Sequence, residues 1–287
     1  MPALSRHSAA SANSAIGAQL REWRQRRRRS QLDLALDASV SQRHISFVES
    51  GKAQPSREMV VLLAEQLEIP LRERNALLLA AGFAPLYPEY RLEDPPLASV
   101  RVAVDGILRG HAPNPALAVD RHWRMVSANA CVAPLLGGVR DQSLLNSPVN
   151  VLRLSLRDGG LAPQIANLAQ WRGHILERLR RQIRASCDPV LIELLAELEA
   201  IPAPLRRGAP SHAPNASEIF VPLELDTEFG RLSLMSVTTV FGTPAEVTVS
   251  ELAIETFFPA DDPTASRLRQ LAGAEPPRGT SRKLPLT

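Results

Sequence analysis

Residues 30–52, SQLDLALDASVSQRHISFVESGK, constrain the fold more than any other stretch of the chain. Leu34 and Ala35 fall on the inner face of one short helix, and Ile45 and Val48 repeat at helical spacing in a second. Val40 lies in the turn between them, and these five positions form a common core only if the two helices cross steeply. The stretch therefore predicts a helix, a tight turn and a second helix.

The ends of both helices carry boundary residues. Ser30 is predicted to cap the first helix, with Asp33 three residues later in a capping box, and Ser41 to cap the second. Val40 is predicted to fill the turn between them, and Gly51 to end the second helix.

Polar side chains are left on the outer face of the second helix, at its first turns. They are Ser41, Gln42, Arg43, His44 and Ser46. A helix of this kind fits the major groove of DNA, where Gln pairs bidentately with adenine and Arg with guanine. The second helix is therefore predicted to recognise base edges.

Other residues near this motif suit the phosphate backbone. Gln31 lies at the N-terminus of the first helix, close to unpaired backbone N–H groups, and Lys52 and Ser56 follow the second helix. The basic run Arg26–Arg29 ends the preceding helix, and Arg27 within it is a candidate phosphate contact. A solvated charge run is the equally good alternative for these arginines.

Residues 16–67 resemble the Cro/C1-type helix-turn-helix domain of the XRE family. The matching positions, in family order and spacing, are Leu20, Ser30-Gln31, Leu34-Ala35, Val40-Ser41, Ile45-Ser46, Glu49-Ser50-Gly51 and Pro55-Ser56. The resemblance implies an all-α bundle of five helices that binds double-stranded DNA, whose last helices often lead to the dimer contact. Ser39 departs from the family, which usually has Gly in this turn; a left-handed Ser costs about 1 kcal/mol.

The positive charge is concentrated on this motif. The net charge is +3. Residues 1–89 carry 12 Lys and Arg against 9 Asp and Glu, whereas residues 90–287 carry 21 of each. Residues 1–55 alone hold 9 against 4. A basic field at the helix-turn-helix is what counterion release from DNA phosphates requires.

Several classes of protein are disfavoured. No apolar run reaches the ~18 residues of a membrane span, and no signal-peptide core is found, so a cytoplasmic protein without a membrane partner is predicted. Cys131 and Cys187 lie far apart and outside any metal-ligand spacing. The sequence contains no phosphate loop, G-x-S-x-G or Ser/His/Asp arrangement, so we predict no enzyme, catalytic residue, metal or cofactor.

The chain of 287 residues is long enough for two domains. We predict a disordered N-terminus at 1–13, which lacks an apolar period, and a DNA-binding domain at 14–82. A Pro-rich linker follows at 83–98. The second domain is expected at 99–272 and a disordered tail at 273–287.

The second domain mixes helices and strands. A hairpin is predicted from Ala116–Asp120 and Trp123–Ala128, and later strands at Ile219–Leu225, Gly230–Phe241 and Leu252–Phe258. Strands on either side of a helical insert predict an α+β sensor of the PAS type, with an antiparallel sheet covered on one face.

The segments 116–129, 150–156 and 230–265 are similar to the ligand-binding domain of MmyB/MltR-type regulators. This resemblance covers nearly all of residues 100–272. It implies a PAS-like fold with an internal apolar pocket, which takes a fatty-acid-like or similar lipophilic molecule. It fixes no individual ligand-binding residue.

Large apolar side chains of this domain are candidates for the pocket lining: Trp123, Met125, Trp171, Met235, Phe241 and Phe257. Ser236 or Thr238 would meet a polar head group. Ordinary core filling is the alternative for all of them. The arginines on the helix around Trp171–Ile183 are candidates either for a second DNA contact or for a solvated face paired with acids.

The leading hypothesis is a regulator that acts as a homodimer on a palindromic operator, with recognition helices roughly 34 Å apart and a lipophilic ligand that modulates DNA affinity. The alternative is a DNA-binding regulator whose second domain serves only dimerisation or a protein partner, without ligand. A cavity too small for a ligand would favour this alternative.

Overall fold

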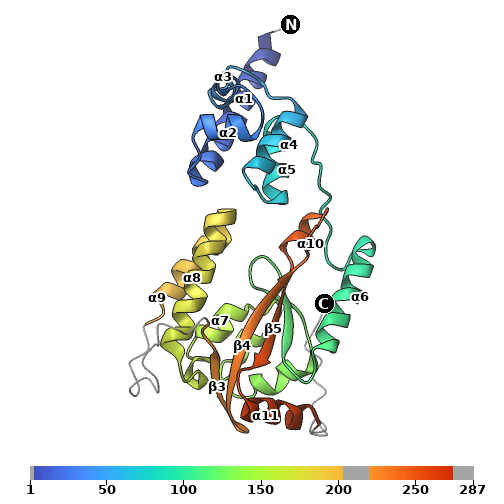
Figure 1. Ribbon diagram of the computed structural model, residues 1–287, viewed down its shortest axis with the longest axis vertical. Coiled ribbons are helices and arrows are strands. Elements are labelled where there is room, and N and C mark those ends of the chain that lie inside the picture. The colour runs from blue at the N-terminus through green and yellow to red at the C-terminus, as the bar shows by residue number, and fades with distance from the viewer. Residues whose placement is uncertain (1–2, 203–219, 274–287) are drawn as a thin grey trace. The chain divides into compact units, whose positions relative to one another are not determined.

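The computed structural model describes residues 3–202 and 220–273 and divides into two compact units, centred on residues 1–89 and on residues 90–273 (Figure 1). The predicted tail at 273–287 lies outside the described residues apart from Gly273. In the part of the chain that is described, no helix combines the length and the hydropathy needed to cross a bilayer.

The first unit is built from five described helices, as predicted: α1 (Ala3–Arg26), α2 (Gln31–Asp37), α3 (Gln42–Glu49), α4 (Arg57–Gln66) and α5 (Leu71–Ala80). Their buried side chains form one cluster that includes the predicted Leu34, Ala35, Ile45 and Val48. Helix α1 begins at Ala3, inside the segment 1–13 that was expected to be disordered. Five of those thirteen residues are Ala, the strongest helix former, or Leu.

The predicted helix caps are present. The Ser30 hydroxyl accepts the Asp33 N–H at 3.0 Å, and the Asp33 carboxylate accepts the Ser30 N–H at 2.8 Å, which completes the capping box. Ser41 and Ser56 cap α3 and α4 in the same way, each through one backbone N–H at 3.2 Å. Gly51 follows α3 with a φ of +72°.

The turn between α2 and α3 keeps its left-handed residue although that residue is serine. Ser39 has a φ of +54°. The Val40 N–H donates to the Ala35 carbonyl at 2.9 Å, and the Ser39 N–H to the Leu36 carbonyl at 3.2 Å. These two bonds hold the turn against a conformational cost of about 1 kcal/mol.

The Pro-rich segment 83–98 is bound to α5 in its first part. Asn75 is buried, and its side-chain Oδ1 accepts the N–H groups of Leu86 and Tyr87, both at 3.0 Å. Its amide donates to the Tyr87 carbonyl at 2.7 Å. Residues 86 and 87 therefore belong structurally to the first unit.

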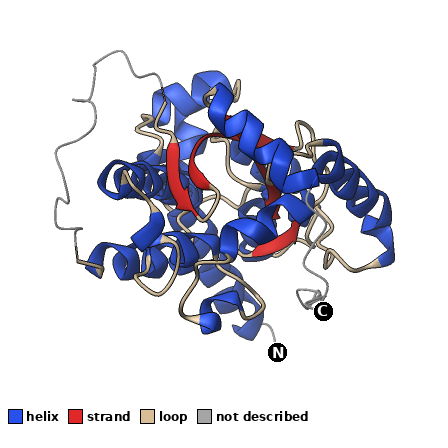
Figure 2. Ribbon diagram, turned by 90° about the horizontal axis from the view of Figure 1, so that it is seen from below, coloured by secondary structure: helices blue, strands red, loops and turns tan. Residues whose placement is uncertain are grey.

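The second unit contains an antiparallel sheet with the strand order β2-β1-β5-β4-β3 among the described residues. The strands are β1 (Ala116–Val119), β2 (Met125–Ala128), β3 (Leu223–Thr227), β4 (Gly230–Val240) and β5 (Ala253–Pro259). The predicted hairpin and the strands predicted at Gly230–Phe241 and Leu252–Phe258 are thus confirmed, as is the α+β, PAS-like class. The strand predicted at Ile219–Leu225 begins at Leu223, and Ile219 lies outside the described residues. The strands are red in Figure 2.

The helical elements of this unit are η1 (Pro95–Leu97), α6 (Ala98–Gly110), η2 (Ala130–Leu136), η3 (Gln142–Leu145), α7 (Val151–Leu156), η4 (Ala162–Gln164), α8 (Leu168–Ser186), α9 (Pro189–Ala200), α10 (Val247–Glu251) and α11 (Asp262–Gly273). The main core packs α7, α8 and α9 against Leu117, Leu225 and Leu234 of the sheet. Residues of α6 pack on Ala116 and Ala118 of the opposite face.

The sheet is therefore covered on both faces around β1, not on one face as predicted. All four residues of β1, Ala-Leu-Ala-Val, are buried. A strand whose residues are all apolar, without alternation, is typical of burial on both sides.

Candidate DNA interface and candidate ligand cavity

Helix α3, the candidate recognition helix, presents its first turn to solvent. Ser41, Gln42 and Arg43 are exposed, and His44 and Ser46 are half-buried. The Arg43 guanidinium carbon lies 5.1 Å from the centre of the Phe47 ring, one helical turn away. This cation–π contact stabilises the position of the guanidinium. The five predicted base-reading residues thus lie together on one helix end.

A buried polar cluster holds α3 from behind. The Glu49 carboxylate, at the end of α3, accepts Nε and Nη2 of Arg24 from α1 at 2.6 and 2.8 Å. It also accepts Nε2 of Gln31 from α2 at 2.9 Å. Arg24 donates a further bond to the Arg29 carbonyl at 2.7 Å. The Glu49 carboxylate therefore joins the first three helices. This structural role of Arg24 and Glu49 was not predicted from the sequence.

The predicted phosphate contacts have different environments. Lys52 and Ser56 are exposed, and Ser56 also marks the N-terminus of α4. Gln31 lies at the N-terminus of α2, but Nε2 of its side chain donates to Glu49. The backbone at this helix end, and not that donor, is thus suited to a phosphate.

Arg27 is engaged inside the first unit. Its Nε donates to the Leu67 carbonyl at 2.9 Å and its Nη2 to the Glu68 carbonyl at 3.0 Å, directly after α4. The last carbonyls of a helix have no partner within the helix, so an arginine that reaches them stabilises its end. The structure thus gives Arg27 a capping role, and its phosphate contact stays a prediction.

The second unit contains a partly open cavity of about 120 Å³ beside the inner face of the sheet. Its lining is mainly apolar and comes from η2, α7, α8 and all five strands. The lining includes Leu117, Trp123, Met125, Val132, Leu135, Leu152, Trp171, Ile175, Leu225, Leu234, Ser236 and Phe257. Five of the predicted lining residues are among them: Trp123, Met125, Trp171, Ser236 and Phe257.

Two predicted lining residues lie elsewhere. Met235 alternates with Leu234 and Ser236 along β4, so its side chain points to the other face of the sheet, and Phe241 directly follows β4. Phe241 packs there with the cluster around Val104 and Leu108 of α6. The assignment of Met235 and Phe241 to the same pocket as Ser236 was therefore wrong.

The cavity is small for a ligand site. Pockets that hold drug-sized molecules usually measure about 300–1,000 Å³. An engineered apolar cavity of about 150 Å³ admits benzene. The space of about 120 Å³ therefore suits a compact apolar group, and a long alkyl chain would have to displace lining side chains.

One end of the cavity is polar. Nη1 of Arg178 donates to Oε2 of Glu255 at 3.0 Å, Nη2 bonds to Oε1, and Nη2 also reaches the Thr238 hydroxyl at 2.5 Å. Glu255 is 4% exposed. His174 stacks on Trp171 with ring centres 5.5 Å apart. Burial, together with the cations of Arg178 and Arg181, lowers the pKa of His174 and favours its neutral form.

The partners of the arginines on α8 favour the interpretation as a face paired with acids. Arg178 pairs with Glu255, and Arg180 with Glu199 at 2.6 Å. Arg172 donates to the carbonyl of Ile201, just after α9, at 3.0 Å. The side chains of these three arginines are therefore bonded to partners within the second unit.

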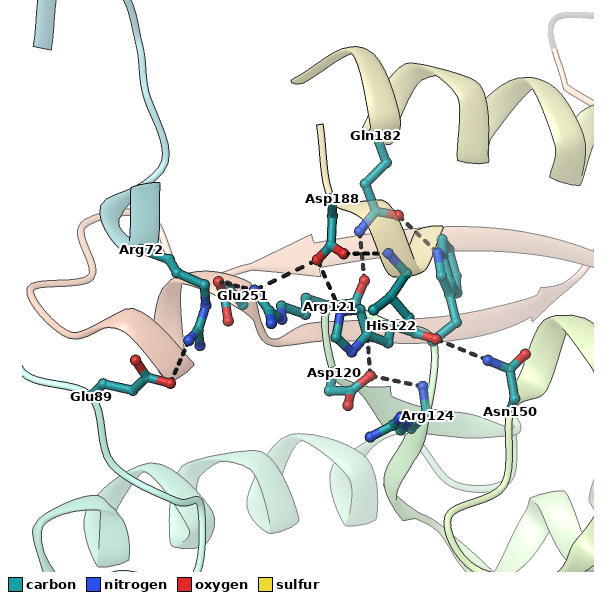
Figure 3. A network of polar contacts seen from close by, with 12 residues as sticks. Arg72, Glu89, Asp120, Arg121, His122, Arg124, Asn150, Gln182, Asp188 and Glu251 are labelled. Atoms are coloured by element: carbon teal, nitrogen blue, oxygen red, sulfur yellow. Dashed lines mark hydrogen bonds and ion pairs between the residues drawn. The ribbon is translucent and has the colours of Figure 1, made fainter. Parts of the chain in front are cut away.

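Hydrogen bonds hold the turn before β2 in place (Figure 3). This turn contains Trp123, which lines the cavity. Asp120 accepts the N–H groups of His122 and Arg124, both at 2.8 Å. Gln182 of α8 donates to the Arg121 carbonyl at 2.9 Å and accepts Nε1 of Trp123 at 2.8 Å. Trp123 has a φ of +64°, a strained conformation for a bulky residue, and these hydrogen bonds offset this strain.

The same turn is also hydrogen-bonded to the start of α9. Nε2 of His122 lies 2.9 Å from Oδ2 of Asp188, and the Val190 N–H donates to Oδ1 at 2.9 Å. Burial raises the pKa of Asp188, but these two hydrogen bonds and the nearby Arg121 outweigh it, so the net effect is a lowered pKa. The ionised form of Asp188 is therefore favoured by folding.

We expect Asp188→Asn to remove part of the acid sensitivity of folding. A carboxylate whose pKa is lower in the folded state stabilises the protein above its unfolded value of about 3.9, and this stabilisation is lost as the pH falls through the folded pKa. Urea unfolding of wild type and variant from about pH 2.5 to 7 measures the difference. Asp226→Asn, in the exposed pair with Arg231, is the control and should follow wild type. Equal slopes below about pH 4 for Asp188→Asn and wild type would contradict the assignment.

No group of three or more His, Cys, Asp or Glu side chains in the described ranges is arranged to hold a metal ion. Cys131 and Cys187 are free thiols.

A helix-turn-helix bundle with an exposed recognition helix, followed in the same chain by an α+β domain around an apolar cavity, defines a DNA-binding transcription regulator with a ligand-binding domain. Residues 20–74 match the family model of the helix-turn-helix, and residues 100–271 that of the MmyB-like transcription regulator ligand binding domain. The second match spans more than half of the chain, which belongs to this MmyB-like family. No individual curated protein matches the chain.

Proposed function

We propose that this transcription regulator binds a palindromic operator as a homodimer, and that a lipophilic molecule in the cavity of the second unit changes its DNA affinity. The observation that carries the proposal is the exposed first turn of α3, which the buried Arg24–Glu49–Gln31 cluster holds in place. In a dimer, two such helices would enter successive major grooves roughly 34 Å apart. The resemblance of the second domain and its mainly apolar cavity lining support the ligand.

Base recognition is tested at Arg43. We expect Arg43→Ala to relax the preference for one base pair, at a cost of about 1–3 kcal/mol for the preferred site. Lys52→Ala should instead weaken binding to all sequences alike and reduce the salt dependence by about one phosphate contact. Binding-site selection with both variants, followed by salt titration, measures the two effects. If the effects are interchanged, the roles of the two residues are wrong.

Regulation is tested through linkage between the sites. A ligand shifts DNA binding only if it binds the two states with different affinity, and DNA must then change ligand affinity by the same factor. Native mass spectrometry of freshly purified protein identifies a retained small molecule. DNA affinity is then measured before and after its removal, with coupling of about 5–150-fold as the usual range.

A matched variant separates cavity occupation from other effects. Val132 lies on the cavity wall, and Val132→Phe places a larger side chain there. We expect this variant to retain less ligand and to bind DNA as the ligand-free protein does. If DNA affinity is unchanged by every molecule that binds the second unit, the sensor role is wrong.

The volume of about 120 Å³ favours one second candidate. In it, the MmyB-like domain serves dimerisation or a protein partner and takes no ligand, because the cavity is only core space. Purified protein that retains no molecule, and whose stability no lipophilic compound changes, would support this candidate.

A further inference from the structure

The polar end of the cavity contains two opposite charges that satisfy each other. Arg178 and Glu255 both line the cavity, together with Ser236 and His174. Both terminal nitrogens of Arg178 bond to the Glu255 carboxylate, and one also bonds to Thr238. The guanidinium also lies 4.5 Å from the centre of the Trp123 ring. Arg178 is thus an already partnered cation.

A ligand carboxylate would meet an unfavourable arrangement at this end. It would approach the Glu255 carboxylate, which is 4% exposed and poorly screened by water. To pair with Arg178 it would have to displace Glu255 and leave that carboxylate buried without its cation, which is strongly unfavourable. His174, whose pKa is lowered by burial, supplies no compensating charge.

An uncharged head group avoids these costs. A hydroxyl or a carboxamide can accept a hydrogen bond from Arg178 and donate one to Glu255 while the ion pair stays intact. Ser236 on the same wall offers both a donor and an acceptor. The apolar remainder of the cavity then takes the body of the ligand, which is comparable in size to benzene.

We propose that the cavity selects an uncharged amphiphile, with a compact apolar body and a head group that both donates and accepts hydrogen bonds, and disfavours a free carboxylate. This inference rests on the proposed ligand role of the cavity and narrows its ligand class. It departs from the fatty-acid-like molecule that the family resemblance implies.

The test compares molecules of one shape and different charge on the full-length protein. Benzamide and benzoate are nearly isosteric, and benzyl alcohol adds a second neutral head. We expect both neutral compounds to bind at least about tenfold more tightly than benzoate in titrations at neutral pH. Val132→Phe should weaken all three, which places the binding in the cavity.

A charge-removing variant tests the cause. Glu255→Gln keeps the side-chain shape and leaves Arg178 without an anionic partner, so benzoate should gain at least about tenfold while benzamide changes little. Glu224→Gln is the matched control. Leu223 and Leu225 line the cavity, so the side chain of Glu224 between them points to the other face of β3. The preference for benzamide over benzoate should therefore not change in this variant.

Benzoate that binds wild-type protein as tightly as benzamide would overturn the inference, and so would Glu255→Gln protein that folds without any gain for benzoate. If Glu255→Gln does not fold, the wild-type comparison alone decides. Failure of all three compounds to bind also overturns the inference. The proposed ligand role is judged separately, by whether a retained molecule changes DNA affinity.

Discussion

Replacing Arg24 with methionine is expected to destabilise the helix-turn-helix unit by about 3–5 kcal/mol and to abolish DNA binding with it. The Glu49 side chain is 4% exposed and accepts two of its three hydrogen bonds from Arg24. Methionine keeps much of the aliphatic length of arginine but not its charge. The carboxylate is then buried beside a single amide donor, which is the costly outcome for a broken buried pair.

The double variant Arg24→Met/Glu49→Met is the control for this cause. If the unpaired charge is responsible, removal of both charges should restore most of the stability, because apolar replacements of a buried pair are often neutral. Urea unfolding of the full chain, with hydrogen exchange of peptides from α1 and α3, measures both variants. A double variant as unstable as the single one would assign the loss to packing instead.

Local features of the fold were predictable from the sequence because their causes lie within a few residues. Ser30 and Asp33 are three positions apart, and the helical spacing of Ile45 and Val48 requires only one helix. The left-handed conformation at Ser39 follows from the turn geometry alone. The strands of the second unit were found for the same reason, since alternation and turn residues are local.

The partners of the charged residues could not be predicted in this way. Arg24 and Glu49 are 25 positions apart, and Arg178 and Glu255 are 77 apart. In the sequence, Arg27 and Arg43 cannot be told apart, because both are arginines in or near the DNA-binding motif. Only the folded chain brings Arg27, directly after α1, to the backbone carbonyls that follow α4, while Arg43 stays exposed.

The error over the pocket has a different origin, because the necessary information was local. Period-two alternation along β4 already separates Met235 from Ser236, so both could not line one cavity. Residue size and polarity alone selected Met235 and Phe241. The face of the strand is the stronger criterion.

Gly17→Ala is expected to lower the stability of the first unit by about 3 kcal/mol, near the upper end of the usual cost of overpacking. Gly17 is buried on α1, and an added Cβ would lie within 3.0 Å of the Val48 carbonyl oxygen and 2.9 Å from that of Glu49. Both atoms belong to the backbone of α3, which cannot move aside as a flexible side chain does. The recognition helix must therefore shift, so DNA affinity should fall as well.

Gly106→Ala is the matched control, because it makes the same chemical change in the middle of α6. A Cβ at Gly106 would meet no atom of the described residues within 4 Å. Alanine in an open helix position is worth about 0.5–1 kcal/mol over glycine, so this variant should be slightly more stable than wild type. Opposite signs for the two variants, measured by urea unfolding and hydrogen exchange, would show that α1 and α3 touch through their backbones at Gly17. Stabilisation by both would mean that the two helices lie farther apart in solution, and that Gly17 does not set the position of α3.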